Sequence, residues 1–192
     1  MKKIAYISTY GESEKLIIRA IAEEDFEVIA YGLNGQGKKK NRFDEEEIDL
    51  ALKYTKDFCK TNVRNLISYA EDDKAYMFRA FKKEDNSYIG GVIIKTILRK
   101  NFQWAEIGYW LLNQHWGQGY GSEMLKAGID IAFNELGFHR LEAHINLDNI
   151  ASQKTAEKAG MKLECIRENF IYEDEKWTDN MIYVINKNNK LI

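Results

Sequence analysis

The amino-acid sequence predicts a mixed α/β fold, in which one central, mostly antiparallel sheet carries helices on both faces. Its 192 residues are enough to bury the core of a single domain of this kind. Apolar residues recur with the period of a helix in four segments and with the period of a strand in seven. Three of these strands follow one another directly, which favours antiparallel hairpins, whereas later strands alternate with helices.

The N-terminal third of the chain is predicted to form one strand and two helices. The strand is Lys15–Ile21, and the acidic residues after it suit the positive end of a helix dipole in the segment 22–33. Asn34–Arg42 is rich in glycine and in basic residues, and we expect a solvated loop there. From Asp44 to Ala70 the apolar spacing is helical again.

Three strands are predicted in the middle of the chain, because apolar and polar residues alternate over Ala75–Lys83, Ser87–Arg99 and Trp104–Leu112. A glycine-rich segment follows and leads into a helix over residues 119–136. Gly137 then stands where a helix commonly ends in a left-handed glycine.

The C-terminal part is predicted to contain one further helix between strands. A strand over His139–Leu147 precedes a short helix within Asp148–Gly160, which opens on an Asp-Asn cap. Two more strands, Lys162–Glu173 and Lys176–Lys187, flank a tight turn. The resulting order places strands on both sides of two helical crossovers, as expected of a mixed sheet.

Composition excludes several classes of function. Lys and Arg number 28 against 30 Asp and Glu, so there is no basic excess of the kind that nucleic-acid or membrane-surface binding needs. Cys59 and Cys165 are isolated from further Cys or His at metal-ligand spacing, so neither a metal site nor a disulfide is expected. No segment has the length of a membrane span or the pattern of a signal peptide, and we expect a cytoplasmic protein.

Three alternate glycines, Gly117, Gly119 and Gly121, stand where the helix over 119–136 begins. The segment lacks the Gly-Lys-Ser/Thr end of a P-loop, and its third glycine comes one residue too early for a dinucleotide-binding fingerprint. Glycine-rich backbone that leads into a helix offers several N–H groups and the helix dipole to an anion such as a pyrophosphate. A flexible loop between strand and helix is the alternative.

Five segments in this order resemble the GNAT superfamily of N-acetyltransferases, and more narrowly its RimJ/RimL branch. These segments are KLIIRAIAEED, AEIGYWL, HWGQGYGSEML, FHRLEAHINLDNIASQKTAEKAGM and REN…KWTDNMIYVI. The resemblance covers about Glu14 to Lys187 of a single domain that spans residues 1–192. It implies a V-shaped split between the fourth and fifth predicted strands, Trp104–Leu112 and His139–Leu147.

The resemblance also implies that acetyl-CoA is the co-substrate. In this superfamily the glycine loop holds the pyrophosphate, and the pantetheine arm lies in the split between the strands. The residues implied to bind it are Trp110, Leu111, Leu112, Gln118, Gly119, Tyr120, Gly121, Ser122, Asn149 and Lys158. Backbone groups of the first three are expected to pair with the arm, while the side chains of Ile107, Tyr109 and Leu111 are expected in the core. Trp116 stands where the superfamily usually has Gln or Arg, and this departure is familiar in the RimJ/RimL branch.

Two residues are candidates for the chemistry. An ammonium group must lose a proton before it attacks a thioester, and Glu106, which aligns with the glutamate proposed for this role in the branch, is the candidate base. The superfamily tyrosine that protonates the leaving thiolate is replaced by Ala156, and the resemblance assigns the role to Ser152. The alternatives are a solvent-facing strand glutamate and a residue of the first turn of a helix. His115 is a weaker candidate near the acceptor.

We therefore expect an N-acetyltransferase that moves an acetyl group directly from acetyl-CoA to a primary amine. The favoured acceptor is the α-amino group of a protein N-terminus, as in the ribosomal-protein enzymes of the RimJ/RimL branch. A small amine such as a polyamine, amino sugar or antibiotic is the alternative acceptor, and a non-catalytic acyl-CoA-binding module is the alternative class. The expected assembly is a monomer or a homodimer.

Overall fold

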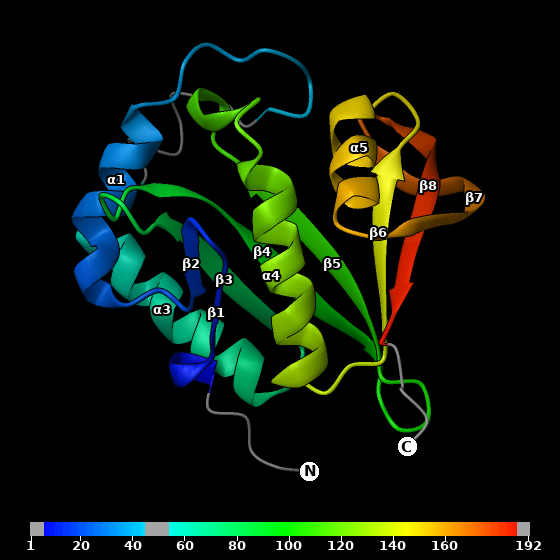
Figure 1. Cartoon of the computed structure of the whole chain (residues 1–192), viewed down its shortest axis with the longest axis horizontal. Coiled ribbons are helices and arrows are strands. Elements are labelled where there is room, and N and C mark those ends of the chain that lie inside the picture. The colour runs from blue at the N-terminus through cyan, green and yellow to red at the C-terminus, as the bar shows by residue number, and fades with distance from the viewer. Residues whose placement is uncertain (1–5, 45–53, 188–192) are drawn as a thin grey trace.

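The computed structural model describes residues 6–44 and 54–187. These residues form an eight-stranded sheet with the order β1-β2-β3-β4-β5-β6-β8-β7 and helices on both of its faces (Figure 1). The strands are β1 Tyr10–Glu12, β2 Leu16–Arg19, β3 Ala75–Lys82, β4 Tyr88–Leu98, β5 Trp104–Leu111, β6 Arg140–Asn146, β7 Lys162–Glu173 and β8 Lys176–Asn186. The helices are α1 Phe26–Asn34, α3 Lys56–Glu71, α4 Tyr120–Asn134 and α5 Ile150–Lys158, with short 3-10 turns at Tyr6–Ser8, Glu23–Asp25 and Asn113–His115.

The seven predicted strands are present, with ends that lie within two residues of the predicted ones. One strand was not expected: β1 is only three residues long and shows no alternation, and its position is set by antiparallel pairing with β2. Of the helix predicted from Asp44 to Ala70, the structure shows α3 from Lys56 onward, and the described residues Asp44, Tyr54 and Thr55 are not helical. Thr55 caps α3 by accepting a hydrogen bond from the N–H of Phe58. The part of that prediction at residues 45–53 lies outside the described residues.

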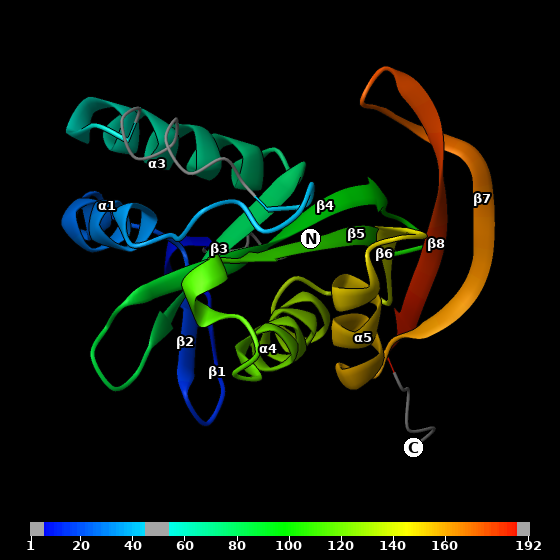
Figure 2. The same ribbon diagram turned by 90° about the horizontal axis from the view of Figure 1, so that it is seen from above.

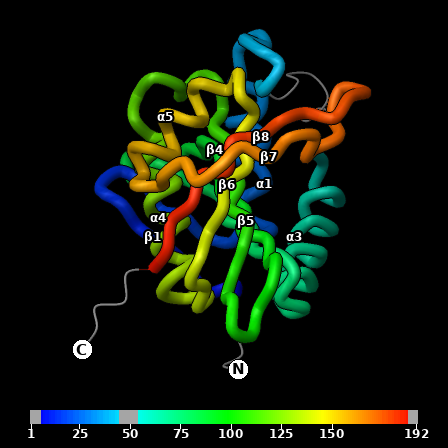
Figure 3. The backbone as a smooth tube through the Cα atoms, turned by 90° about the vertical axis from the view of Figure 1, so that its right-hand side faces the viewer, coloured from blue at the N-terminus to red at the C-terminus, as the bar shows by residue number. Residues whose placement is uncertain are grey.

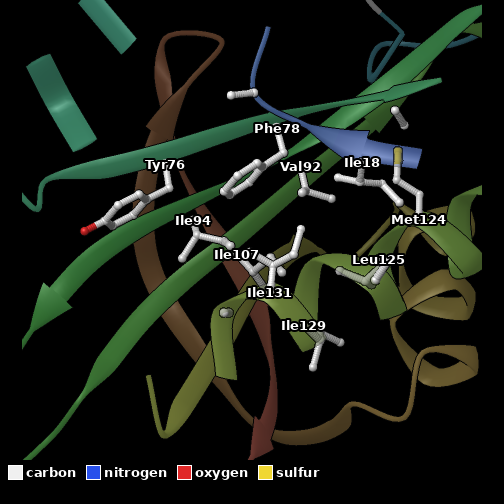
Figure 4. Packing of buried hydrophobic residues seen from close by; sticks show 14 of the residues in the cluster. Ile18, Tyr76, Phe78, Val92, Ile94, Ile107, Met124, Leu125, Ile129 and Ile131 are labelled. Atoms are coloured by element: carbon white, nitrogen blue, oxygen red, sulfur yellow. The ribbon is translucent and has the colours of Figure 1, made fainter. Parts of the chain in front are cut away.

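The helices cover the sheet unequally. α1 and α3 lie on one face, and α4 lies on the other with α5 beside it (Figure 2). The face under α4 holds much of the core, where Phe78 and Ile107 of the sheet meet Leu125 and Ile131 of the helix (Figure 4). All four of these side chains are buried, because the apolar stripe of α4 points at the apolar side of the strands.

The predicted split in the sheet is confirmed, and it lies between β5 and β6. All neighbouring strands of the sheet pair antiparallel except these two, which pair in parallel at only three positions, from Trp104 with Arg140 to Glu106 with Glu142. Beyond Glu106 the two strands part, so that β1–β5 form one arm of a V and β6–β8 form the other (Figure 1).

Two glycines in β4 let the first arm pack tightly against β5. Gly90 has φ +154°, and a Cβ added there would lie 2.2 Å from the carbonyl oxygen of Trp110. A Cβ at Gly91 would lie 2.6 Å from the indole ring of Trp110, which is also stacked by the guanidinium group of Arg79. The position of Trp110 therefore depends on the absence of a side chain at Gly90 and at Gly91.

We expect Gly90→Ala to lower the free energy of unfolding by about 2–4 kcal/mol, since both the backbone angle and the contact with Trp110 resist a methyl group. Gly137→Ala is the matched control, because Gly137 also has a positive φ (+72°) but open space around its Cβ position. Its expected cost is about 1–2 kcal/mol, the strain of a left-handed residue alone. Urea unfolding followed by circular dichroism measures both, and equal losses would contradict the steric argument.

Candidate active site

A pocket of about 370 Å³ lies in the opening of the V. Its walls come from the end of β5, the glycine turn before α4, the first turns of α5 and the segment Gly35–Asp44, which we call the strap. The lining residues are Gln36, Asn41, Phe43, Asp44, Tyr109, Trp110, Leu111, Leu112, Trp116, Gly117, Gly119, Gly121, Ser122, Asn149, Ala151, Ser152, Lys154, Thr155 and Lys158. Of the residues predicted to bind a cofactor, only Gln118 and Tyr120 do not line it.

The glycine turn is shaped by backbone angles rather than by close contacts. Gly117 and Gly119 have φ of +78° and +85°, and a Cβ on either would meet no atom within 4 Å. Gly119 caps α4 in the left-handed conformation, so the first turn of the helix opens directly on the pocket at Gly121 and Ser122. The first N–H groups of a helix have no acceptor within it, and here they face a space that suits an anion.

The two side chains between these glycines, those of Gln118 and Tyr120, do not line the pocket. Gln118 donates a hydrogen bond to the carbonyl oxygen of Gln114, and Tyr120 packs edge-on against the ring of His115. Burial lowers the pKa of His115, which does not line the pocket.

The opposite wall carries the cationic side chains. Lys154 and Lys158 lie one turn apart on α5 and both line the pocket. Asn149 caps this helix, and its side-chain oxygen accepts a hydrogen bond from the N–H of Ser152 at 3.1 Å. The predicted capping role of Asn149 is therefore confirmed. Two lysines opposite the N-terminus of α4 give this end of the pocket the chemistry of a site for phosphate groups.

Fewer backbone groups at the end of β5 are free to bind a ligand than the sequence predicted. The N–H of Leu112 donates to Ile89 and its carbonyl accepts from His115, so neither group is free for the pairing with a pantetheine arm. Backbone N–H groups point to alternate edges along a strand. The backbone groups of Trp110, two residues before Leu112, therefore also point toward β4, where Trp110 pairs with Gly91. Leu111 faces the gap, but its carbonyl oxygen accepts from the indole N–H of Trp116 at 2.7 Å. The N–H of Leu111, like that of Tyr109 two residues before it, points into the gap, where a ligand can accept from it.

Tyr109 is a pocket residue that the sequence reasoning assigned to the core. Its hydroxyl group crosses from β5 to α5, where it donates to the carbonyl oxygen of Ser152 and accepts from the Oγ of Ser152, both at 2.8 Å. Burial raises the pKa of Tyr109 to about 12. The strand alternation correctly placed Tyr109 on the face of Ile107, where it is half-buried and packs against the core. Because the neighbouring strand has parted, Tyr109 also lines the pocket.

Glu106 lies on the other face of β5, opposite to Tyr109. Its Oε1 is 3.2 Å from the Nζ of Lys95, and its side chain is 28% exposed. Glu106 does not line the pocket. Its register partner is Glu142 on β6, in the last pair before the strands diverge. Glu106 therefore stands at the apex of the V, on the face that also carries α1 and α3.

Glu142 is a buried carboxylate on this second face that sequence reasoning missed. Its side chain is 1% exposed and contacts Arg140 at 2.8 Å, Arg167 at 3.0 Å and His144 at 3.2 Å. Burial raises the pKa of Glu142, but the hydrogen bonds from Arg140 and His144 and the charge of Arg167 outweigh burial and hold the pKa below its ordinary value. The cluster joins β6 to β7 of the second arm, next to Glu106.

The strap is a largely exposed loop, as its composition suggests, but it is also tied to the rest of the protein. The buried side chain of Asn113 accepts from the N–H of Gly37 at 2.8 Å and donates to Asp44 at 2.9 Å. Arg42 reaches the second arm, where it pairs with Asp148 at 2.8 Å and Asp174 at 3.2 Å. Figure 3 shows the strap, in blue, at the same end of the molecule as α5 and the tip of the β7–β8 hairpin.

Within residues 6–44 and 54–187, no three His, Cys, Asp or Glu side chains are grouped as metal ligands. No helix in the same ranges is long and apolar enough to cross a membrane.

The comparisons with known proteins agree with this architecture. The family model of the acetyltransferase (GNAT) domain matches residues 15–162. A probable N-acetyltransferase of Bacillus subtilis (strain 168), YjcK, is 33% identical over 132 residues, which are 69% of this chain and 73% of the relative.

Two solved structures share the fold at lower identity. The RimJ protein of Mycobacterium smegmatis in complex with CoA-disulfide has a TM-score of 0.75 at 18% identity, over 94% of this chain and 88% of the other. RimL, a ribosomal L7/L12 α-N-protein acetyltransferase in complex with coenzyme A, has a TM-score of 0.71 at 23% identity, over 94% and 97%. With the family match over most of its length, the chain belongs to the GNAT family of N-acetyltransferases.

Proposed function

We propose that this protein transfers an acetyl group directly from acetyl-CoA to the α-amino group of a protein N-terminus. The observation that carries the proposal is the pocket in the V. One end has the N-terminus of α4 and two lysines for phosphates, and the other end has the N–H of Leu111 in the gap and a pair of hydroxyl groups. These residues fit an elongated thioester with an anionic head. We also propose that residues 1–192 form one domain.

The reacting end of the pocket offers a group for each stage of the transfer. The thioester supplies the activated acyl group. The N–H of Leu111 points into the gap, where it is placed to donate a hydrogen bond to the thioester carbonyl oxygen as negative charge develops there. Ser152 lies across the gap on α5, next to the departing sulfur in this arrangement.

Glu106 is the proposed base because of its place at the apex. An amine that enters from the face opposite the pocket meets Glu106 before it reaches the gap, and a carboxylate there accepts the proton of the ammonium group directly or through water. Direct transfer is favoured over a covalent relay, because Cys59 is buried and Cys165 is on the outer strand β7, and neither lines the pocket.

The structural relatives named for ribosomal-protein acetylation favour a peptide N-terminus as the acceptor. A small amine is the alternative acceptor. Mass spectrometry of proteins and metabolites from a strain that lacks the gene identifies the acceptor, and acetylated protein N-termini that disappear in that strain are the expected result.

We expect Glu106→Gln to lower the rate of CoA-thiol release with an amine or peptide acceptor by about 100-fold at neutral pH, since the base contributes at least that much. The KM for acetyl-CoA stays near the wild-type value, because Glu106 does not line the pocket. Glu12→Gln is the control: Glu12 is also a strand glutamate paired with a lysine, Lys83, at 2.7 Å, but it lies in β1. Full activity in Glu106→Gln would rule out the assignment of the base.

We expect the double variant Lys154→Gln/Lys158→Gln to bind CoA about 10-fold to 100-fold more weakly, since each lost charged contact costs about 1 kcal/mol at an exposed site. The loss shrinks as salt rises. Titration calorimetry with CoA measures it, and Lys126→Gln on the exposed side of α4 is the control. An unchanged Kd in the double variant would show that the phosphates bind elsewhere.

Thermal stabilisation by acetyl-CoA with no loss of thioester across amine and peptide panels would instead favour a non-catalytic acyl-CoA-binding module.

A further inference from the structure

The hydroxyl group of Ser152 is already engaged in the protein. It donates to the Oη of Tyr109, and Tyr109 in turn donates to the carbonyl oxygen of the same serine. Tyr109 comes from the first arm of the V and Ser152 from α5 beside the second, so the contact spans the gap in which the thioester is proposed to lie.

We propose that Tyr109 is a positioning residue for Ser152, which it holds on the pocket wall and prepares to donate a hydrogen bond to the leaving sulfur. This inference rests on the proposed acetyl transfer. When a ligand sulfur arrives, the two hydroxyl groups rotate: Tyr109 donates to the Oγ of Ser152, and Ser152 turns its own proton toward the sulfur. A tyrosine hydroxyl can both donate and accept, so the exchange needs no further group.

The step is balanced without a proton leaving either side chain. The amine nitrogen has by then bonded to the acetyl carbon, and its surplus proton passes to the proposed base Glu106. The carbonyl double bond re-forms as the carbon–sulfur bond breaks, the electron pair of that bond goes to the sulfur, and the resulting thiolate accepts the hydrogen bond from Ser152. Because a CoA thiol has an ordinary pKa of about 8.5, the thiolate is a fair leaving group that needs stabilisation more than protonation. Two linked hydroxyl groups polarise each other and so form a stronger donor than one.

Other hydroxyl groups on the pocket wall are committed to the backbone. Ser122 donates to the carbonyl oxygen of Gly119, and Thr155 donates to that of Ala151. The position of the superfamily tyrosine, Ala156, is fully buried and does not line the pocket. Tyr109 and Ser152 are therefore the pair of wall hydroxyls in the described residues that bond to each other.

The environment keeps Tyr109 in its donor form. Burial raises its pKa to about 12, above the range in which a thiol ionises. Tyr183 approaches Tyr109 from β8, and the remaining titratable side chains on the pocket wall are Lys154 and Lys158 of α5 and Asp44 of the strap. Lys154 and Lys158 also attract a thiolate, so the preference for CoA over desulfo-CoA is compared between the wild type and variants in which both lysines are unchanged.

The test compares the binding of CoA with that of desulfo-CoA by calorimetry at about pH 6.5 and about pH 9.5, on either side of the thiol pKa of about 8.5. We expect the wild type to favour CoA about 10-fold at the higher pH, where the ligand is a thiolate, and far less at the lower pH. Tyr109→Phe and Ser152→Ala abolish this pH-dependent preference. Tyr183→Phe keeps it, although it also removes a tyrosine hydroxyl bonded to α5, at Glu157.

A double variant completes the design. If Tyr109 acts through Ser152, adding Tyr109→Phe to Ser152→Ala changes neither the binding preference nor kcat further, whereas a merely structural role lowers both in either background. A preference for CoA that survives in Tyr109→Phe would overturn the inference alone. Wild-type protein that binds neither CoA nor desulfo-CoA would overturn the proposed function, and the two failures are thus distinguishable.

Discussion

The parting of β5 and β6 after Glu106 is the constraint on which the site depends. Two parallel strands that separate leave N–H and C=O groups without partners along both inner edges, and such groups are costly unless something else satisfies them. One of these groups is satisfied within the protein, because the indole N–H of Trp116 donates to the carbonyl oxygen of Leu111. The N–H of Leu111 stays open to the gap, so the break in the sheet supplies the hydrogen-bond donor that a carbonyl ligand needs.

The break also leaves different charged groups on the two faces of β5. Lys154, Lys158 and the N-terminus of α4 gather on the pocket side, whereas on the other face Glu106 is paired with Lys95 and the buried Glu142 with Arg140 and Arg167. An anionic donor is therefore attracted to the pocket side. In the proposed arrangement the acceptor approaches Glu106 from the other face, and the two substrates meet only where the strands part, which suits direct transfer.

Periodicity was sufficient to predict seven of the eight strands, the helices and, with the family resemblance, the glycine turn and the split. It failed where contacts between residues far apart in the sequence determine the structure. Alternation placed Tyr109 against the core, but it could not show that Tyr109 also lines the pocket and bonds to Ser152. The composition of the strap predicted an exposed loop, but it could not show that Arg42 meets Asp148 across 106 residues. Leu112 was expected to offer backbone groups, yet Ile89 and His115 already use them, which depends on turn geometry that no residue pattern encodes.

The width of the V is set by contacts at three heights, and these differ in strength. At the apex, backbone pairing fixes the two arms together. Midway, the half-buried Tyr109 reaches Ser152, and at the mouth Arg42 ties the strap to Asp148 and Asp174. Exposed ion pairs such as those of Arg42 contribute little to stability, whereas hydrogen bonds between half-buried hydroxyl groups are more costly to break. The mouth of the V is therefore the part that can open for a ligand at low cost, while the reacting end keeps its geometry.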